Sequence, residues 1–496
     1  MSSDVCVDAP LGWRDIAAVA GGARLTLSGA ARERIMGASA IVESLVERGI
    51  RGYGINTGIG ALCDVIVDRA DQQALSHNIL MSHACGVGVH LAREQVRAIM
   101  AAQVNNYALG ASGLRLELVE ALCRLLEHDC LPVVPARGSV GYLSHSAAIG
   151  LVLIGAGFAT YKGQRCTGAD ALDAIGLAPF NLGAKEGLSL VNGTPCSTGL
   201  ACLAAARLSR LLDWADAAAA MSYENLGSQA GVFAAAPLAL RRSPGLVQVG
   251  EAMRAYLEGS DMLTRTAGTR TQDPLSLRAV PQIHGAIRDA LDQVGEVLDR
   301  ELASVTDNPA VAGTPEAPKV HSQAHAVPAA IGLAMDGFGI AAAELAAISE
   351  RRIDRLVNPL VSGLPAFLAA DSGVCSGYMI AQYTAASLVA ENRRLAAPAS
   401  LDGGITSALQ EDILVHATPA SLKALAILDN VESVLSIELL AAAQAYDLQQ
   451  PASPGAGIRH VYDRIRTTVP HYADDRPMMA DIEAMTELVR TSGTNG

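Results

Sequence analysis

Residues 426–449 read AILDNVESVLSIELLAAAQAYDLQ, and this stretch decides the fold of the chain. It contains no glycine or proline and is rich in alanine and leucine, which are strong helix formers. Its apolar residues recur at helical spacing and leave almost no polar face. A helix of this kind needs neighbours on every side, so the stretch predicts a long helix buried in a bundle.

Similar apolar blocks occur at residues 200–220, 281–302, 326–356 and 374–395. Each block is longer than an average globular helix. Loops rich in glycine, proline and asparagine separate them, whereas the first part of the chain has shorter elements and more loops. We therefore predict an all-α protein with a loop-rich N-terminal lobe in residues 1–180 and a central and C-terminal helix bundle in residues 181–496.

The composition limits the classes of partner. The 496 residues include 37 basic and 50 acidic side chains, which gives a net charge of −13, and 50% of the residues are hydrophobic. Such a chain is globular rather than disordered. With 4% aromatic residues and no basic run, it lacks the features of a nucleic-acid-binding surface. Polar loops rich in Tyr, Asn, Arg and Glu favour a small polar molecule as the partner.

The cysteines and the N-terminus predict a cytoplasmic protein. The nine cysteines form no Cys-x-x-Cys pair, which is typical of free thiols in a reducing compartment. The first residues lack a basic region followed by an apolar run, so no secretory signal is expected. Residues 138–161 carry no charged side chain over a length that spans a bilayer. Because glycines, serines and a histidine interrupt them, we interpret them as a core helix and expect no membrane partner.

A metal site is not expected. His321 and His325 are four residues apart, which on a helix would place two imidazoles on one face. No His-Glu-x-x-His signature accompanies them. We interpret them as solvated or hydrogen-bonded histidines.

Short polar motifs follow one another along the chain from about residue 50 to 450. The first two are YGINTG at 53–58 and MSHACG at 81–86. The others are KEGL at 185–188, NGT at 192–194, QDP at 272–274 with Ser276 and Arg278, TDNP at 306–309, SERR at 349–352, SGYM at 376–379, EN at 391–392 and QED at 410–412. In this order the motifs resemble the histidine and phenylalanine ammonia-lyase family. The resemblance also implies a homotetramer whose sites are assembled from loops of several subunits.

The resemblance implies catalytic roles for three residues. Tyr53 matches the tyrosine that usually removes the β-proton of the substrate, and Glu411 matches a residue that meets the imidazole ring in the histidine branch. Lys185 is a further candidate, for polarising the ring. Alternatively, Lys185 forms a structural ion pair with Glu186 or another acid. A tyrosine normally titrates near ~10, so Tyr53 needs nearby positive charge or a concerted transfer to act as a base.

The resemblance implies substrate-binding roles for five further residues. Arg278, with Asn192 beside it, matches the group that grips the substrate carboxylate. His83 matches a residue that faces the imidazole ring, and Met379 and Gln410 belong to the same recognition pattern. Taken singly, each of these residues has a simpler interpretation, such as a surface cap for Arg278.

The chain departs from the family at its electrophile. Family members cyclise an Ala-Ser-Gly tripeptide that follows Gly-Ser-Val-Gly into a methylidene-imidazolone. Here GSVG at 138–141 is followed directly by YLSH at 142–145, so the chain is three residues short. Either the protein lacks the electrophile, or the sequence as written omits the modified tripeptide. Tyr142, Leu275, Gln103 and Ala303 stand where the family has Asp, Tyr, Arg and Asn, and these changes favour true absence.

An absent electrophile changes the expected substrate. A quaternary ammonium leaves as a neutral amine without covalent help, if a base and a carboxylate clamp remain. We therefore predict trimethylamine elimination from a histidine-like betaine, ergothioneine to thiourocanate, as in ergothionase, with no cofactor. One alternative is an ordinary histidine ammonia-lyase with the methylidene-imidazolone. Another is a catalytically silent relative that binds imidazole metabolites.

Overall fold

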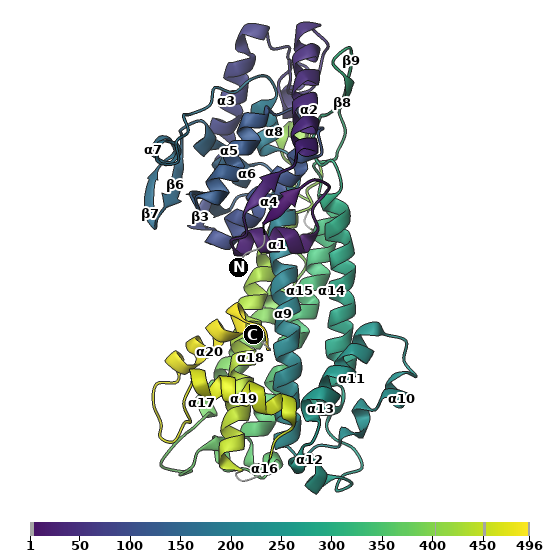
Figure 1. The fold of residues 1–496 in the computed structure, drawn as a ribbon, viewed down its shortest axis with the longest axis vertical. Helices are drawn as coiled ribbons and strands as arrows, with labels where there is room; N and C mark the ends of the chain where they lie inside the picture. The colour runs from purple at the N-terminus through teal and green to yellow at the C-terminus, as the bar shows by residue number, and fades with distance from the viewer. Residues whose placement is uncertain (1–3, 402, 450–452, 495–496) are drawn as a thin grey trace. The chain divides into compact units, whose positions relative to one another are not determined.

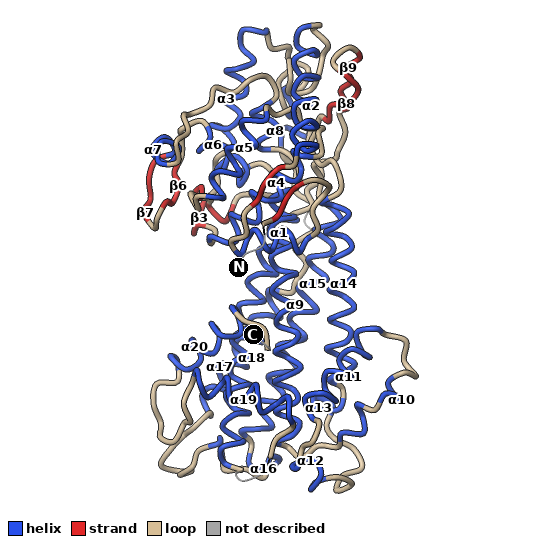
Figure 2. Tube along the Cα trace, in the orientation of Figure 1, coloured by secondary structure: helices blue, strands red, loops and turns tan. Residues whose placement is uncertain are grey.

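The structure is a computed structural model that describes residues 4–401, 403–449 and 453–494. Helices dominate and the strands are short, so the predicted all-α class is confirmed (Figures 1 and 2). The chain divides into two compact units. Unit 1 consists of Met1–Ala206, Val294–Asp336 and Pro398–Leu422, and unit 2 of Arg207–Gln293, Gly337–Ala397 and Lys423–Gly496. The single boundary expected near residue 180 stays a prediction.

Four long helices contribute residues to both units. They are α9 (Pro195–Asn225), α14 (Val280–Leu302), α15 (Ala329–Val357) and α18 (Ala417–Leu448). The apolar blocks that predicted long helices lie in these four helices and in α17 (Met379–Leu395). Helical periodicity therefore located the long helices, although the blocks at 326–356 and 374–395 begin a few residues before α15 and α17.

Unit 1 also contains eleven shorter helices and all of the strands that the structure describes. Its helices are α1 (Trp13–Gly21), α2 (Gly29–Glu47), η1 (Gly60–Leu62), η2 (Arg69–Asp71), α3 (Gln72–His83), α4 (Arg93–Ala108), α5 (Leu116–Glu127), α6 (Ser144–Leu153), α7 (Gly168–Ala174), α8 (Glu186–Val191) and η5 (Ser407–Leu409). Its strands are β1 (Val5–Val7), β2 (Leu25–Leu27), β3 (Val87–His90), β4 (Leu131–Pro132), β5 (Pro135–Arg137), β6 (Phe158–Tyr161), β7 (Gln164–Thr167), β8 (Ala310–Thr314) and β9 (Ala317–His321). They pair as β1-β2, β3-β5, β4-β6-β7 and β8-β9; only β1-β2 is parallel among the described strands.

Among its described residues, unit 2 contains helices and the loops between them but no strand. Besides α17 and its parts of the long helices, it contains η3 (Ala230–Phe233), α10 (Ala235–Leu238), α11 (Pro244–Leu257), α12 (Asp261–Thr266), α13 (Leu275–Arg278), α16 (Pro359–Ser362), η4 (Ala366–Leu368), α19 (Ala456–Thr468) and α20 (Met479–Thr491).

Most of helix α18 in unit 2 is buried, and its buried acidic residues are paired. Glu432 accepts from Arg207 of α9 at 2.8 Å, and Glu438 accepts from Arg352 of α15 at 2.6 Å. All four side chains are buried. Because an unpaired buried charge is strongly destabilising, these pairs align α18 with α9 and α15.

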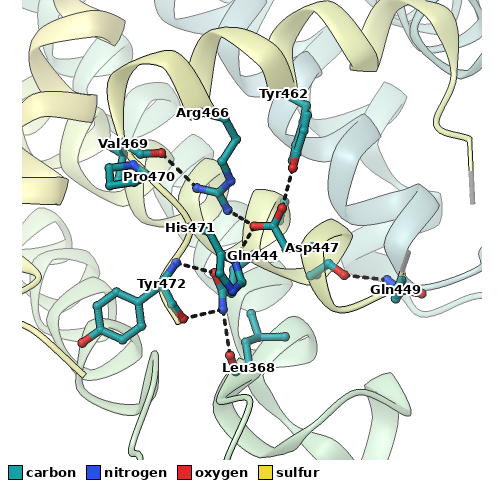
Figure 3. Close-up of polar contacts among 12 residues, drawn as sticks. Leu368, Gln444, Asp447, Gln449, Tyr462, Arg466, Val469, Pro470, His471 and Tyr472 are labelled. Carbon is teal, nitrogen blue, oxygen red and sulfur yellow. Dashed lines mark hydrogen bonds and ion pairs between the residues drawn. The ribbon is translucent and has the colours of Figure 1, made fainter. Parts of the chain in front are cut away.

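The C-terminal end of α18 is tied to the segment that follows it (Figure 3). Asp447 accepts hydrogen bonds from Arg466 at 2.6 Å and from the hydroxyl of Tyr462, and it lies 2.8 Å from Nδ1 of His471. One turn earlier, the buried amide of Gln444 donates to the carbonyl oxygens of Leu368 and Tyr472. These contacts satisfy backbone groups that would otherwise be buried without a partner.

The uncharged stretch at 138–161 is not one long helix. It forms the buried helix α6 and then enters the β6-β7 hairpin. Among the described helices, α15 alone has the length and composition to cross a membrane. Of its apolar window 56% is buried, and core helices of soluble proteins meet the same test.

His145 on α6 predicts a loss of stability in acid. Its Nε2 lies 3.2 Å from the carbonyl oxygen of Ala136, and its buried Nδ1 has no hydrogen-bond partner in the described structure. Burial lowers the pKa of His145 below its usual 6.5, although the contact with Ala136 opposes the shift. The folded state therefore binds the proton less readily than the unfolded state. The contribution of the neutral His145 to the free energy of unfolding is therefore fully present above pH 6.5. It is lost progressively as the pH falls below that value.

We expect the free energy of unfolding in urea to be smaller at pH 5.5 than at pH 7. In His145→Gln this difference should shrink, by up to about 1.4 kcal/mol per pH unit. The exposed His460 provides the matched control, His460→Gln. An identical pH dependence in wild type and His145→Gln would contradict this assignment.

Candidate active site

Unit 1 contains a cavity of about 1070 Å³. Its lining residues fall within residues 51–64, 82–85, 138–144, 188–192, 322–327 and 406–413, together with Asn308. Tyr53, His83, Asn192, Gln410 and Glu411 are all among them. The structure thus brings five of the eight predicted site residues to one cavity.

Tyr53 lies in a loop whose backbone is closely packed. The Gly54 N–H donates to Thr57 Oγ1 at 3.1 Å, and Gly54 has a φ of +61°. A Cβ at Gly54 would lie 2.3 Å from Leu188, so a larger residue would displace the loop. At the end of the loop, the Gly60 N–H donates to the hydroxyl oxygen of Tyr53 at 2.8 Å. The loop therefore holds the phenol oxygen in a defined position at the cavity.

The electrostatics around Tyr53 favour the neutral phenol. Burial raises its pKa above the usual value of 10.0, and the negative charge of Glu411 adds to that rise. The hydrogen bond from Gly60 acts in the opposite direction, because it stabilises the phenolate. A basic role for Tyr53 therefore requires additional positive charge when the ligand is bound.

His83 ends α3 and is partly buried at the cavity. Its Nδ1 lies 3.0 Å from the hydroxyl of Ser82. Burial lowers the pKa of His83 below 6.5, although a backbone contact with Ile79 and the charge of Glu411 oppose the shift. At neutral pH the ring is uncharged and can donate or accept one hydrogen bond at each nitrogen.

Glu411 follows η5 in a tight turn that also carries Gln410. The Thr406 N–H donates to the carbonyl oxygen of Glu411 at 2.8 Å, and the Thr406 hydroxyl donates to Glu411 Oε2 at 3.1 Å. The same carboxylate oxygen accepts from the hydroxyl of Tyr142 at 3.1 Å. The carboxylate of Glu411 therefore accepts two hydrogen bonds, both at Oε2.

The turn before α6 carries Tyr142 to the cavity. The Ser139 hydroxyl donates to the carbonyl oxygen of Tyr142 at 2.9 Å and accepts from the Gly141 N–H at 3.2 Å. Leu143 has φ 76° and ψ −82°, a strained conformation for a non-glycine residue, and its N–H donates to Val191 at 3.1 Å. Such strain persists only where the surroundings fix the backbone, so the backbone next to Tyr142 is held in place.

Lys185 does not line the cavity. Its fully buried Nζ donates to Ser112 O and Ser189 Oγ, both at 2.7 Å, and to Asp307 Oδ2 at 2.9 Å. All three ammonium protons are thereby used. Burial lowers the pKa of Lys185, and the negative charge of Asp307 counteracts this shift. The geometry supports the structural ion pair over contact with a ligand.

The acid that pairs with Lys185 is Asp307. The other candidate, Glu186, instead pairs with Arg115 at 2.7 Å. Asp307 also links this pair to the cavity. Asn192, which lines it, donates to Asp307 Oδ1 at 3.3 Å and to the Asn308 carbonyl oxygen at 2.5 Å. The buried pair therefore fixes the amide of Asn192.

Arg278 and Met379 belong to unit 2 and are not among the residues that line the cavity. Arg278 ends α13, and its buried Nε has no hydrogen-bond partner in the described structure. Met379 begins α17. Their substrate-binding roles stay predictions.

The described residues contain no group of three or more His, Cys, Asp or Glu side chains arranged to hold a metal ion. His321 ends strand β9 and His325 lies in the turn after it, so the two rings do not share a helix face.

Sequence reasoning missed Tyr142 and Thr406 as site residues. Tyr142 was conspicuous as a departure from the family pattern, but that pattern gave it no role. Thr406 carries no motif signal. Its contact with Glu411 becomes visible only once the turn at 406–411 is formed.

Comparisons with known proteins cover almost the whole chain. The sequence model of the family described as aromatic amino acid lyase matches residues 11–467. A histidine ammonia-lyase of Symbiobacterium thermophilum is 45% identical over 471 residues, 94% of this chain and 92% of that protein. The crystal structure of histidine ammonia-lyase from Trypanosoma cruzi has a TM-score of 0.91 and 34% identity, covering 98% of this chain and 93% of that one. The ergothionase structure from Treponema denticola has a TM-score of 0.91 and 28% identity, covering 99% of both chains.

These comparisons contradict one prediction. The expected release of trimethylamine from ergothioneine is wrong, because the relative with 45% identity over nearly its full length is a histidine ammonia-lyase. The physical reason is that the three missing residues do not distinguish the two leaving groups. A primary ammonium, like a trimethylammonium, can leave as a neutral amine. The shortened loop therefore does not identify the group that leaves.

Proposed function

Because the chain belongs to the aromatic amino acid lyase family, we propose that it removes the α-amino group of histidine as ammonia and releases the imidazole acrylate. The chain is a carbon–nitrogen lyase of this family. The observation that carries the proposal is the 45% identity with a histidine ammonia-lyase over 94% of the chain. The cavity supports it, since it holds a phenol, an imidazole and a carboxylate together.

The proposed elimination uses side chains at the cavity. Tyr53 acts as the phenolate, after its own proton has passed to solvent. It accepts the β-proton of the substrate, and the electrons of that C–H bond form the Cα–Cβ double bond. The Cα–N bond breaks with its electron pair on nitrogen, so the α-ammonium leaves as ammonia. Glu411 and His83 hold the imidazole ring. Because its pKa is raised, Tyr53 depends on the positive charge of the substrate to act as a base.

The electrophile of the family does not fit this loop. Its formation from an Ala-Ser-Gly tripeptide needs a serine followed by glycine, but Ser139 precedes Val140 and Ser144 precedes His145. The Ser139 hydroxyl is also engaged in hydrogen bonds within the turn. We therefore propose that the chain has no methylidene-imidazolone, and the steps above involve only its own side chains.

We also propose that the protein is a homotetramer with sites shared between subunits. Large apolar side chains are exposed on α15 and α17, among them Leu333 at 65% and Tyr383 at 63%. Exposed apolar surface of this kind favours association. A second copy would then supply Arg278 and Met379, which do not line the cavity of unit 1.

A cytoplasmic location remains a proposal. The nine cysteines are all free thiols in the structure, and this favours a reducing compartment.

The decisive experiment incubates the purified protein with histidine and, as the control substrate, with phenylalanine. We expect ammonia and the acrylate chromophore to appear with histidine only. Binding of histidine or the imidazole acrylate without any turnover would contradict the proposed reaction and favour a silent binding relative. The loop at residues 138–145 lacks the tripeptide, so this second outcome tests whether the chain turns the substrate over at all.

The intact mass of the same sample tests the proposal on the electrophile. We expect the mass of the 496-residue chain. A mass higher by one dehydrated Ala-Ser-Gly unit would show that the electrophile is present and would contradict that proposal.

A further inference from the structure

The phenol of Tyr142 links two separate parts of the cavity wall. It comes from the turn before α6, whereas Glu411 comes from the turn after η5. Their contact at 3.1 Å joins segments 269 residues apart in the sequence. Thr406 donates to the same carboxylate oxygen, but from within the turn that carries Glu411. Among the described residues, Tyr142 is thus the only donor to this carboxylate from another segment.

The Tyr142 hydroxyl acts as a donor under ordinary conditions. Burial raises its pKa well above the usual 10.0, and both the charge of Glu411 and the hydrogen bond to it add to the rise. A neutral phenol that donates to a carboxylate fixes the position of the oxygen that accepts. The contact therefore holds Oε2 of Glu411 in place.

The two hydroxyl donors occupy one side of the carboxylate only. Tyr142 and Thr406 both bind Oε2, while Oε1 of Glu411 makes no hydrogen bond with another described residue. A ligand with a ring N–H, such as an imidazole, would complete the coordination of the carboxylate at Oε1. An imidazole ring has such a donor, whereas a phenyl ring does not.

We infer that Tyr142 is a positioning residue, which holds Oε2 of Glu411 so that Oε1 accepts the ring N–H of an imidazole ligand. The inference rests on the proposed function, because it specifies how the substrate ring is recognised. Tyr142 acts through Glu411. Replacing Tyr142 should therefore not change ligand affinity further in a variant that already lacks the Glu411 carboxylate.

A double-mutant cycle tests this dependence. The probe is the imidazole acrylate, and its dissociation constant is measured by calorimetry for wild type, Tyr142→Phe, Glu411→Gln and the double variant. We expect Tyr142→Phe to weaken binding about 10-fold in the wild-type background, as for the loss of a hydrogen bond to a charged group. In the Glu411→Gln background the same change should alter binding less than about 2-fold. Equal losses in both backgrounds, or no loss in either, would overturn the inference.

Two further measurements complete the experiment. Thermal unfolding checks that each variant is folded, and Tyr142→Leu provides a second cycle should the phenylalanine variant not fold. With histidine as substrate, Tyr142→Phe should raise KM more than it lowers kcat, because the lost contact serves ring binding. A change confined to kcat would count against a positioning role.

The proposed function is tested separately by wild-type turnover. If the wild type binds the acrylate but does not deaminate histidine, the proposed reaction fails and the cycle still decides the role of Tyr142. If histidine is deaminated while the cycle shows no coupling, the inference fails and the proposed reaction stands. A wild type that does not bind the acrylate overturns the inference.

Discussion

Replacing Tyr53 with phenylalanine is expected to lower kcat for histidine at least ~100-fold while changing substrate affinity only a few-fold. Removal of a positioned acid or base typically costs this much or more. Phenylalanine keeps the ring and removes only the oxygen that, in the proposed reaction, accepts the β-proton. The affinity should change little, because the proposed reaction assigns the imidazole ring to Glu411 and His83 rather than to Tyr53.

The experiment measures kcat from the acrylate chromophore and the dissociation constant of the acrylate by calorimetry. Tyr161→Phe is the matched control, because Tyr161 lies on strand β6, away from the cavity. The Gly60 N–H loses its acceptor in Tyr53→Phe, so a stability loss of about 1 kcal/mol is also expected. Unchanged turnover would remove Tyr53 from the mechanism.

Replacing Lys185 with methionine is expected to lower the free energy of unfolding by about 3–5 kcal/mol. The change leaves the carboxylate of Asp307 buried without its cation, which is the costly case for a buried ion pair. It also removes the donors to Ser112 and Ser189. The measurement is chemical unfolding followed by circular dichroism.

Lys162→Met is the matched control for this variant. Lys185 and Lys162 have positive φ values of 66° and 49°, so the new side chain meets a left-handed backbone at both positions. Lys162 is exposed and should tolerate the change within about 0.5 kcal/mol. A loss below about 1 kcal/mol in Lys185→Met would contradict the structural role of the pair. The double variant Lys185→Met with Asp307→Leu should recover part of the stability, since no charge is then stranded.

The helices and the order of the loops followed from the amino-acid sequence alone. In residues 426–449, helix propensity and apolar spacing act between neighbours three and four positions apart, so the residues that form α18 could be recognised without their partners. The motifs around Tyr53, His83 and Glu411 identified the family for the same reason, because each motif is a short run of contiguous residues.

The tertiary structure alone decided which polar side chains reach the cavity. Lys185 and Glu411 both belong to motifs, yet one is buried against Asp307 while the other lines the cavity. Tyr142 broke the family pattern, and only the approach of the turn at 406–411 gave it a partner. Burial and ion pairing depend on residues that are far apart in the chain, and no local pattern encodes their distances. Local patterns therefore encode the helices and the family motifs, whereas packing between distant segments selects the side chains that line the cavity.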